Sequence, residues 1–140
     1  MRLILLKPKE EPQIITVNKN NIDLAGLIES DAITCITRKI DNTYFDFYID
    51  DCALFRSEKY VTAMCRNTKE FLCGNILIAA HGTSEHIEGL SKFKIEKIMD
   101  KFNWVCNESV TKRHNEIPIR TTDYGPVYLH KKGYLLIYGY

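Results

Sequence analysis

No hydrophobic run in the 140-residue sequence approaches the roughly 20 consecutive apolar residues that a membrane-spanning helix requires. The opening segment Met1–Pro8 carries only four apolar residues in a row between charged ones, which is too short for the core of a signal peptide. We therefore expect no insertion into a membrane.

An excess of one charge is also missing, because 19 basic and 18 acidic residues leave a formal net charge of +1 at pH 7. A general nucleic-acid-binding protein carries a strong positive excess, and a protein that mimics DNA carries a strong negative one. The balance argues against both classes for the molecule as a whole. Local charged patches, and with them a contact to nucleic acid, stay open.

The five cysteines are odd in number and include no Cys-x-x-Cys pair. Small secreted proteins that are held together by disulfides use even numbers of cysteines at close spacing. We therefore expect free thiols in a reducing cytoplasm. Cys35 and Cys73 fall within predicted strands, where a cysteine is more often a small core residue than a nucleophile.

What the sequence does contain is enough apolar side chains for a core: 45% of the residues are hydrophobic and 26% are charged, as in ordinary globular domains. The segment Phe71–Gly82 contains no Asp, Glu, Lys or Arg. We interpret it as one buried strand and expect the sheet to be organised around it.

Four further segments have the composition of strands. Leu3–Leu6 is apolar on both faces, as in a central strand, and Gln13–Val17 returns after a charged turn that contains prolines. Ala32–Ile40 and Tyr44–Ile49 are joined by turn-forming residues and predict a hairpin. Ala53–Phe55 predicts either another short strand or, together with Val61 and Met64, an irregular helix.

Two helices are expected from apolar spacing. The first is capped by Asn20 or Asn21 and ends near Glu29 or Ser30. The second is capped by Ser91, and its apolar face is formed by Ile95, Ile98, Met99 and Phe102.

The C-terminal part reads as added strands. Lys131–Gly133 has the composition of a turn between Val127–His130 and Tyr134–Tyr138, which predicts a hairpin. An exposed edge at Tyr134–Tyr138 would favour a homodimer made by pairing of edges. The predicted fold is α+β: a mixed or antiparallel sheet is packed by two helices in a core domain of residues 1–103, and residues 104–140 form an appended C-terminal β-hairpin element within one compact unit.

Three segments together resemble an uncharacterised family of short proteins from phages and conjugative elements of Gram-positive gut bacteria: Ile49–Phe55, Cys73–Ile78 and Ile95–Phe102. The resemblance covers residues 1–103. The family usually has a Pro-x-Asn-Arg loop before its glycine-headed strand, whereas Ala63–Asn67 stands there in this chain, with Arg66 as the counterpart of the arginine.

The resemblance brings no known activity, but it implies a mobile-element setting in the cytoplasm of a bacterial host. Accessory proteins of this size in such elements often act against host defence. We therefore expect a binding protein, without enzymatic activity or cofactor, that inhibits a host protein complex such as a CRISPR effector.

The surface favoured for that partner combines tyrosines with cations near the C-terminus. Tyrosine offers a large contact area at a small entropy cost, which suits protein interfaces, and aromatic rings beside cations also suit stacked bases. The residues concerned are Arg120, Tyr124, Tyr128, Lys131, Lys132, Tyr134 and Tyr138.

Two alternatives involve the loop after the predicted central strand. In the first, the protein sequesters a nucleotide signal, although the Gly-x-x-x-x-Gly-Lys pattern of phosphate loops is missing. The residues that would meet this ligand are Arg66, His81, Thr83, Ser84 and His86. In the second, the protein is a small hydrolase or nuclease that uses the same histidines. Their spacing fits no named metal-ligand motif.

Overall fold

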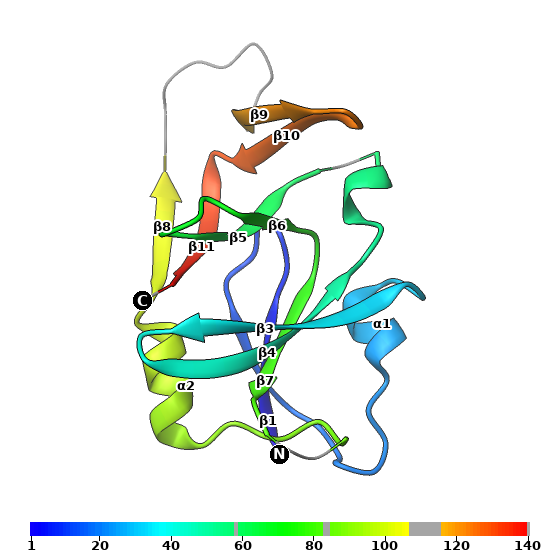
Figure 1. Cartoon of the computed structure of the whole chain (residues 1–140), viewed down its shortest axis with the longest axis vertical. Helices are drawn as coiled ribbons and strands as arrows, with labels where there is room; N and C mark the ends of the chain where they lie inside the picture. The colour runs from blue at the N-terminus through cyan, green and yellow to red at the C-terminus, as the bar shows by residue number, and fades with distance from the viewer. Residues whose placement is uncertain (58, 83–84, 107–115, 140) are drawn as a thin grey trace.

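The computed structural model describes residues 1–57, 59–82, 85–106 and 116–139. Its largest element is a five-stranded antiparallel sheet in the order β2-β1-β7-β4-β3 (Figure 1). The strands are β1 (Arg2–Leu6), β2 (Gln13–Thr16), β3 (Ile33–Ile40), β4 (Thr43–Asp50) and β7 (Ile76–Ala80). The predicted strands at the positions of β1, β2, β3 and β4, and the hairpin of β3 and β4, are confirmed.

Strands β1 and β7 are buried on both faces of this sheet. Side chains alternate along a strand, so Ile4 and Ile78 face a main core between sheets, whereas Leu3 and Leu77 face an outer core that includes Ile28. All five residues of β7 are buried. The uncharged composition of this segment follows from its central position, as the sequence predicted.

A four-stranded sheet covers the main core from the other side, in the order β6-β5-β11-β8. Its strands are β5 (Val61–Cys65), β6 (Phe71–Cys73), β8 (Phe102–Cys106) and β11 (Lys132–Tyr138). The C-terminal strand β11 is parallel to β5 and antiparallel to β8. A bridge between Ile40 and Gly139 joins the two sheets at one edge.

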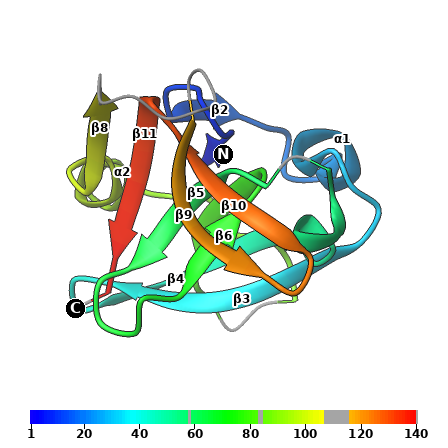
Figure 2. The ribbon, with the colours of Figure 1, turned by 90° about the horizontal axis from the view of Figure 1, so that it is seen from above.

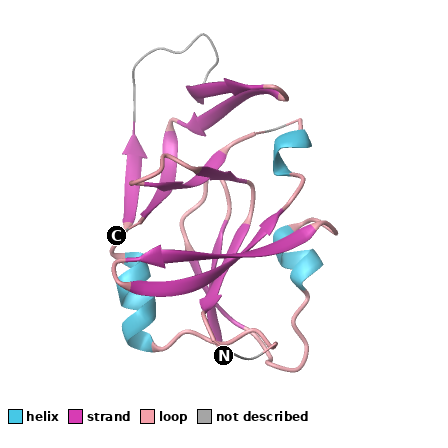
Figure 3. Cartoon of the chain, viewed as in Figure 1, coloured by secondary structure: helices cyan, strands magenta, loops and turns pink. Residues whose placement is uncertain are grey.

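A two-stranded ribbon of β9 (Glu116–Thr122) and β10 (Gly125–His130) forms a third layer. It lies above β5 and β6 in Figure 1, and it crosses over them in Figure 2, where the molecule is seen from above. Val127 and Leu129 of the ribbon pack with Val61, Cys73 and Leu135 in a smaller core. Strands dominate the molecule (Figure 3), so the coarse prediction of a fold with both helices and strands is confirmed, while the strands form three sheets and not the single main sheet that was expected.

The first helix, α1 (Leu24–Ile28), is capped by Asp23 and not by the asparagines before it. Asp23 Oδ1 accepts the backbone N–H of Gly26 at 3.0 Å. Asn20 and Asn21 instead belong to a separate turn, in which Asn21 N–H donates to the carbonyl of Asn18. The prediction of the cap was therefore wrong by two or three residues.

The second helix, α2 (Lys92–Met99), is capped by Ser91 as predicted, and Ile95 and Ile98 enter the main core. Phe102 is not on this helix, because the chain leaves it at Asp100 and starts β8. The undecided segment near residue 53 forms a short 3₁₀ helix, η1 (Ala53–Phe55), while Val61 lies in a strand. No helix in the described part of the chain is long and apolar enough to cross a membrane.

The segment Phe71–Gly82 is not one strand. It divides into β6 and β7, which belong to different sheets, and the break lies at Gly74 and Asn75. Gly74 has φ of +78°, a conformation that side chains with a Cβ rarely adopt. The glycine therefore turns the chain from one sheet into the other, and does not simply begin a strand.

The expected C-terminal hairpin was also wrong, because β10 pairs with β9 and β11 lies in the other sheet. Gly133 makes no turn: it is buried in β11, where a Cβ would lie 3.4 Å from the backbone of Lys9. Since β11 is paired on both sides, the edge expected for a dimer is not exposed. The boundary between a core domain and a C-terminal extension near residue 103 stays a prediction. Strand β11, which follows that boundary, pairs with β5, which precedes it.

Candidate binding surfaces

Two exposed aromatic rings pack against each other beside the ribbon. Phe55 is 65% exposed and Tyr124 is 51% exposed, and their ring centroids lie 4.4 Å apart. The rings come from segments 69 positions apart: Phe55 ends η1, and Tyr124 lies in the turn between β9 and β10. The turn positions Tyr124 because its N–H donates to Thr122 Oγ1 at 3.2 Å.

A buried carboxylate holds the segment that carries Phe55. The Asp50 side chain, only 8% exposed, accepts hydrogen bonds from Ser30 Oγ at 2.9 Å, from the N–H of Cys52 at 2.9 Å and from Arg56 Nε at 3.0 Å. Burial alone would raise the pKa of Asp50, but these hydrogen bonds outweigh it and lower that pKa. Hydrogen bonds from Cys52 and Arg56 thus tie the segment that contains Phe55 to Asp50 at the end of β4.

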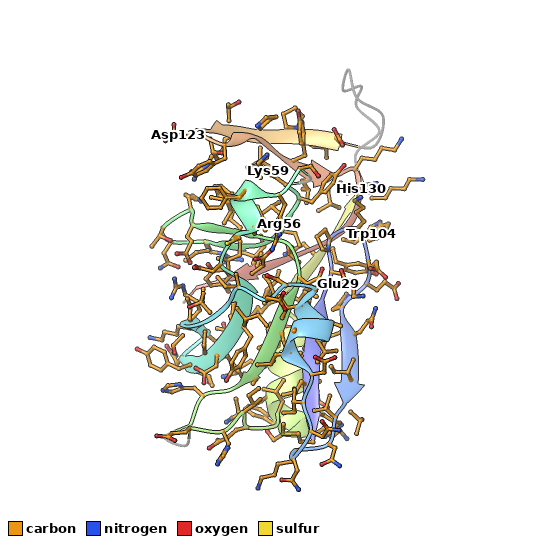
Figure 4. All side chains as sticks on the ribbon, turned by 90° about the vertical axis from the view of Figure 1, so that its right-hand side faces the viewer. Glu29, Arg56, Lys59, Trp104, Asp123 and His130 are labelled. Carbon is orange, nitrogen blue, oxygen red and sulfur yellow. The ribbon has the colours of Figure 1, made fainter. Side chains whose placement is uncertain are left out.

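A second aromatic pair lies on the four-stranded sheet. Trp104 of β8 is 55% exposed and faces Tyr134 of β11 in the strand register, with 4.9 Å between ring centroids. The Tyr134 hydroxyl also donates to Glu11 at 3.4 Å. Figure 4 shows Trp104 well away from Asp123, which precedes Tyr124, so the two pairs are separate.

The predicted partner-binding residues do not form one surface. Tyr138 is 2% exposed and packs edge-on against Phe47 in the main core, so its assignment to the surface was wrong. Arg120 is exposed but lies over the ring of Phe71, 4.0 Å from its centroid. Tyr128 is half-buried, and its N–H donates to the carbonyl of Lys59.

Two lysines of that set follow β10. Lys131 is half-buried and Lys132 is exposed. Of the four predicted tyrosines, Tyr124 is the most exposed, and Tyr134 is half-buried beside Trp104. The structure therefore adds Phe55 and Trp104 to the candidate surface. Neither was predicted, because neither belongs to the tyrosine-rich run, and each acquires its partner ring only through the fold.

The alternative ligand-binding residues are not brought together by their contacts. His81 Nδ1 lies 2.8 Å from Asp46 Oδ1, and the ring of His81 packs near Tyr44. Arg66 is exposed in the turn after β5, where its N–H donates to the carbonyl of Tyr138. An acidic partner on the histidine does not favour a phosphate at that position.

His86 lines a different cavity, of about 330 Å³, with Met1, Lys19, Ile87, Glu88 and Gly89. Thr83 and Ser84 lie outside the described residues. Within the described part of the chain, no three side chains of His, Cys, Asp or Glu are grouped as a metal site would require.

Burial would raise the pKa of the Cys65 thiol, but hydrogen bonds with Thr68 and Asn67 outweigh it and lower that pKa, although Cys65 is only 8% exposed. The thiols of Cys73 and Cys35 give the enzymatic alternative no support. Burial raises the pKa of Cys73 to about 12, and burial together with Asp46 raises the pKa of the exposed Cys35. A thiol needs a lowered pKa or an adjacent base to act as a nucleophile. His81 and His130 instead pair with Asp46 and with the carbonyl of Lys132.

Comparison of the chain with protein-family models, with curated proteins and with solved structures finds no match.

Proposed function

We propose that the chain is an accessory protein of a mobile genetic element that binds a protein component of a host defence system and inhibits it, with a CRISPR effector as the first class of target. It acts without chemistry of its own, in the cytoplasm of the bacterial host. The setting rests on the resemblance of residues 1–103 to proteins of phages and conjugative elements. The mode of action rests on the exposed pair of Phe55 and Tyr124.

This pair supports binding because two large rings are held half in water. Burial of such rings by a partner removes apolar surface from water, and rigid aromatic residues dominate the energetics of protein interfaces. The conformational cost is small, because Asp50 already fixes the segment of Phe55 and the ring contact already orders Tyr124.

The charges beside the pair fit a protein better than a nucleic acid. Figure 4 shows Lys59 and, lower, Arg56 beneath the ribbon whose end carries Asp123, so both signs of charge occur on this side of the molecule. Arg56 is moreover paired with Asp50. A backbone of phosphates would require several unpaired cations, whereas the mixed polar rim of a protein interface does not.

The test is binding to a purified candidate effector and to host lysate, with wild type, Phe55→Ala/Tyr124→Ala and Phe93→Ala. Phe93 is a matched control, because it is 69% exposed and lies on α2, far from the ribbon in Figure 1. We expect the double variant to lose about 30-fold or more in affinity, the amount that one interface hot spot of 2 kcal/mol contributes. The control should bind like wild type.

Equal thermal unfolding of the three proteins establishes that the loss is local. The absence of any stoichiometric partner for the wild type would contradict the proposal, as would full binding by the double variant. A plaque assay in a host with active CRISPR immunity gives the functional readout: phage growth should rise with wild type and with Phe93→Ala, but not with the double variant.

A further inference from the structure

A polar pocket of about 390 Å³ lies where the turn between β1 and β2 meets the end of α1 and the link between β6 and β7. This volume is within the range of small-molecule sites in proteins. The lining residues are Lys7, Pro8, Lys9, Glu10, Glu29, Tyr60, Gly74 and Asn75. None of them belongs to the aromatic pairs described above.

The most telling group in this pocket is the side chain of Asn75. Asn75 is only 8% exposed, and its Nδ2 donates to the carbonyl of Leu27 at 3.3 Å and to Glu29 Oε2 at 3.1 Å. These two bonds fix the orientation of the amide. Among the described residues no donor reaches Asn75 Oδ1. Water can reach this oxygen, because it is not one of the fully buried unpaired atoms of the described residues, and it can therefore accept an N–H group from a ligand in the pocket.

Glu29 extends the acceptor side of the pocket. Its Oε2 receives Asn75 Nδ2, while its Oε1 lies 3.9 Å from Lys7 Nζ, which is a long distance for an ion pair. An ammonium group placed between the Glu29 carboxylate and Asn75 Oδ1 would therefore find one negative charge and one neutral acceptor. That combination suits a primary amine.

The opposite charge is supplied by two lysines in the same turn. Lys7 Nζ makes the long contact to Glu29, and Lys9 Nζ lies 4.3 Å from the centroid of the Tyr60 ring. Both ammonium groups are able to attract an anion. Among the described lining residues, Glu10 and Glu29 balance the charges of Lys7 and Lys9, so a ligand with several negative charges is disfavoured.

We propose that this pocket binds a small zwitterion, namely a free amino acid or a short peptide. The carboxylate of the ligand lies against Lys7 and Lys9, and its ammonium group donates to Asn75 Oδ1 and Glu29. The site is independent of the surface of Phe55 and Tyr124, so either assignment can fail without the other.

The experiment is a titration of the ¹⁵N-labelled protein with each of the twenty amino acids and with dipeptides that end in alanine. Three comparison ligands lack one half of a zwitterion. Inorganic phosphate and adenosine monophosphate are anions without an ammonium group, and ethanolamine is an amine without a carboxylate. We expect at least one zwitterion to move the side-chain amide resonances of Asn75 and to raise the Tm by about 5–10 °C at 100 times its Kd. Phosphate and ethanolamine alone should do neither.

Two charge-removing variants locate the ligand. Lys7→Met and Glu29→Gln should each weaken binding at least about tenfold, the effect of one charge-assisted hydrogen bond. The matched control is Lys92→Met/Glu96→Gln on the exposed face of α2, which removes the same two charges and should bind normally. Glutamine at position 29 can still accept from Asn75, so the local fold is kept.

Three outcomes would overturn the assignment. The first is that no amino acid or dipeptide perturbs Asn75. The second is that phosphate or adenosine monophosphate binds as well as the best zwitterion, since the pocket would then be a plain anion site. The third is unchanged binding in Lys7→Met and Glu29→Gln, which would place the ligand elsewhere.

Discussion

Replacement of Tyr138 by alanine tests whether the C-terminal strand belongs to the main core. Tyr138 is 2% exposed, its ring packs edge-on against Phe47 at 5.4 Å, and its hydroxyl donates to Glu70 Oε1 at 2.5 Å. Glu70 in turn pairs with Arg38. Because Tyr138 lies in β11, the last strand described, a strand that was merely appended would tolerate the loss of this ring.

The expected loss follows from the contacts. Truncation of a buried large aromatic ring to alanine costs about 3–5 kcal/mol, because a cavity remains where the ring was. Tyr138→Phe keeps the ring and removes only the hydrogen bond to Glu70. That bond involves a charged group, but the Glu70 side chain is 38% exposed and water can replace the hydroxyl, so we expect about 1 kcal/mol.

Urea unfolding followed by far-UV circular dichroism and by the fluorescence of the single tryptophan, Trp104, measures both variants. With an m-value of about 2 kcal/mol/M, Tyr138→Ala should lower the midpoint by about 2 M and Tyr138→Phe by about 0.5 M. Tyr124→Ala is the control, because Tyr124 is an exposed tyrosine in the turn between β9 and β10. This variant loses one exposed ring contact, so its urea midpoint should fall by less than about 0.7 M. A Tyr138→Ala midpoint within about 0.5 M of wild type would refute the placement of this ring in the core.

Three further predictions concern buried polar groups and the backbone. Asp50→Asn should destabilise the fold by about 2–3 kcal/mol at pH 7. The pKa of Asp50 is lower in the folded protein than the ordinary 3.8, so the stabilisation by this carboxylate is present above about pH 4. In urea titrations, the difference in stability between variant and wild type should therefore shrink as the pH falls through the folded pKa. Gly74→Ala meets no steric clash but places a Cβ at φ +78°, so differential scanning calorimetry should show a loss of about 1–2 kcal/mol, and an unchanged Tm would contradict the strained conformation. In the native protein at pH 8, iodoacetamide should modify the exposed Cys35 well before Cys73, whose pKa is about 12, and mass spectrometry that finds Cys73 modified first would be inconsistent with its burial.

The sequence predicted well those elements whose pattern is local. Leu3–Leu6 is apolar at consecutive positions because β1 is covered on both faces, and Ser91 caps α2 through a bond that spans three residues. The β3–β4 hairpin likewise depends on neighbouring segments and a short turn. In each case the residues that determine the structure lie within one element or between adjacent ones.

Glycines show why the rest could not be predicted. Gly133 was interpreted as a turn residue, yet it is buried in β11 because the backbone of Lys9 passes close by. Gly74 was interpreted as the start or interior of a strand, yet it directs the chain from one sheet to another. A glycine admits a turn, a break or a close approach, and only the position of distant chain segments decides among them.

The candidate surface illustrates the same limit with tyrosines. Tyr134 and Tyr138 are four positions apart on β11, so alternation places both on one face of the strand, and the sequence assigned both to the surface. They do share a face, but the five-stranded sheet covers only one end of it: Tyr138 lies over Phe47, whereas Tyr134 lies beside Glu11 and Trp104. Alternation determines which face a residue takes, while burial depends on how far the opposing layer extends. The exposed rings relevant to binding are therefore found where a layer ends, and that boundary is a property of the assembled sheets.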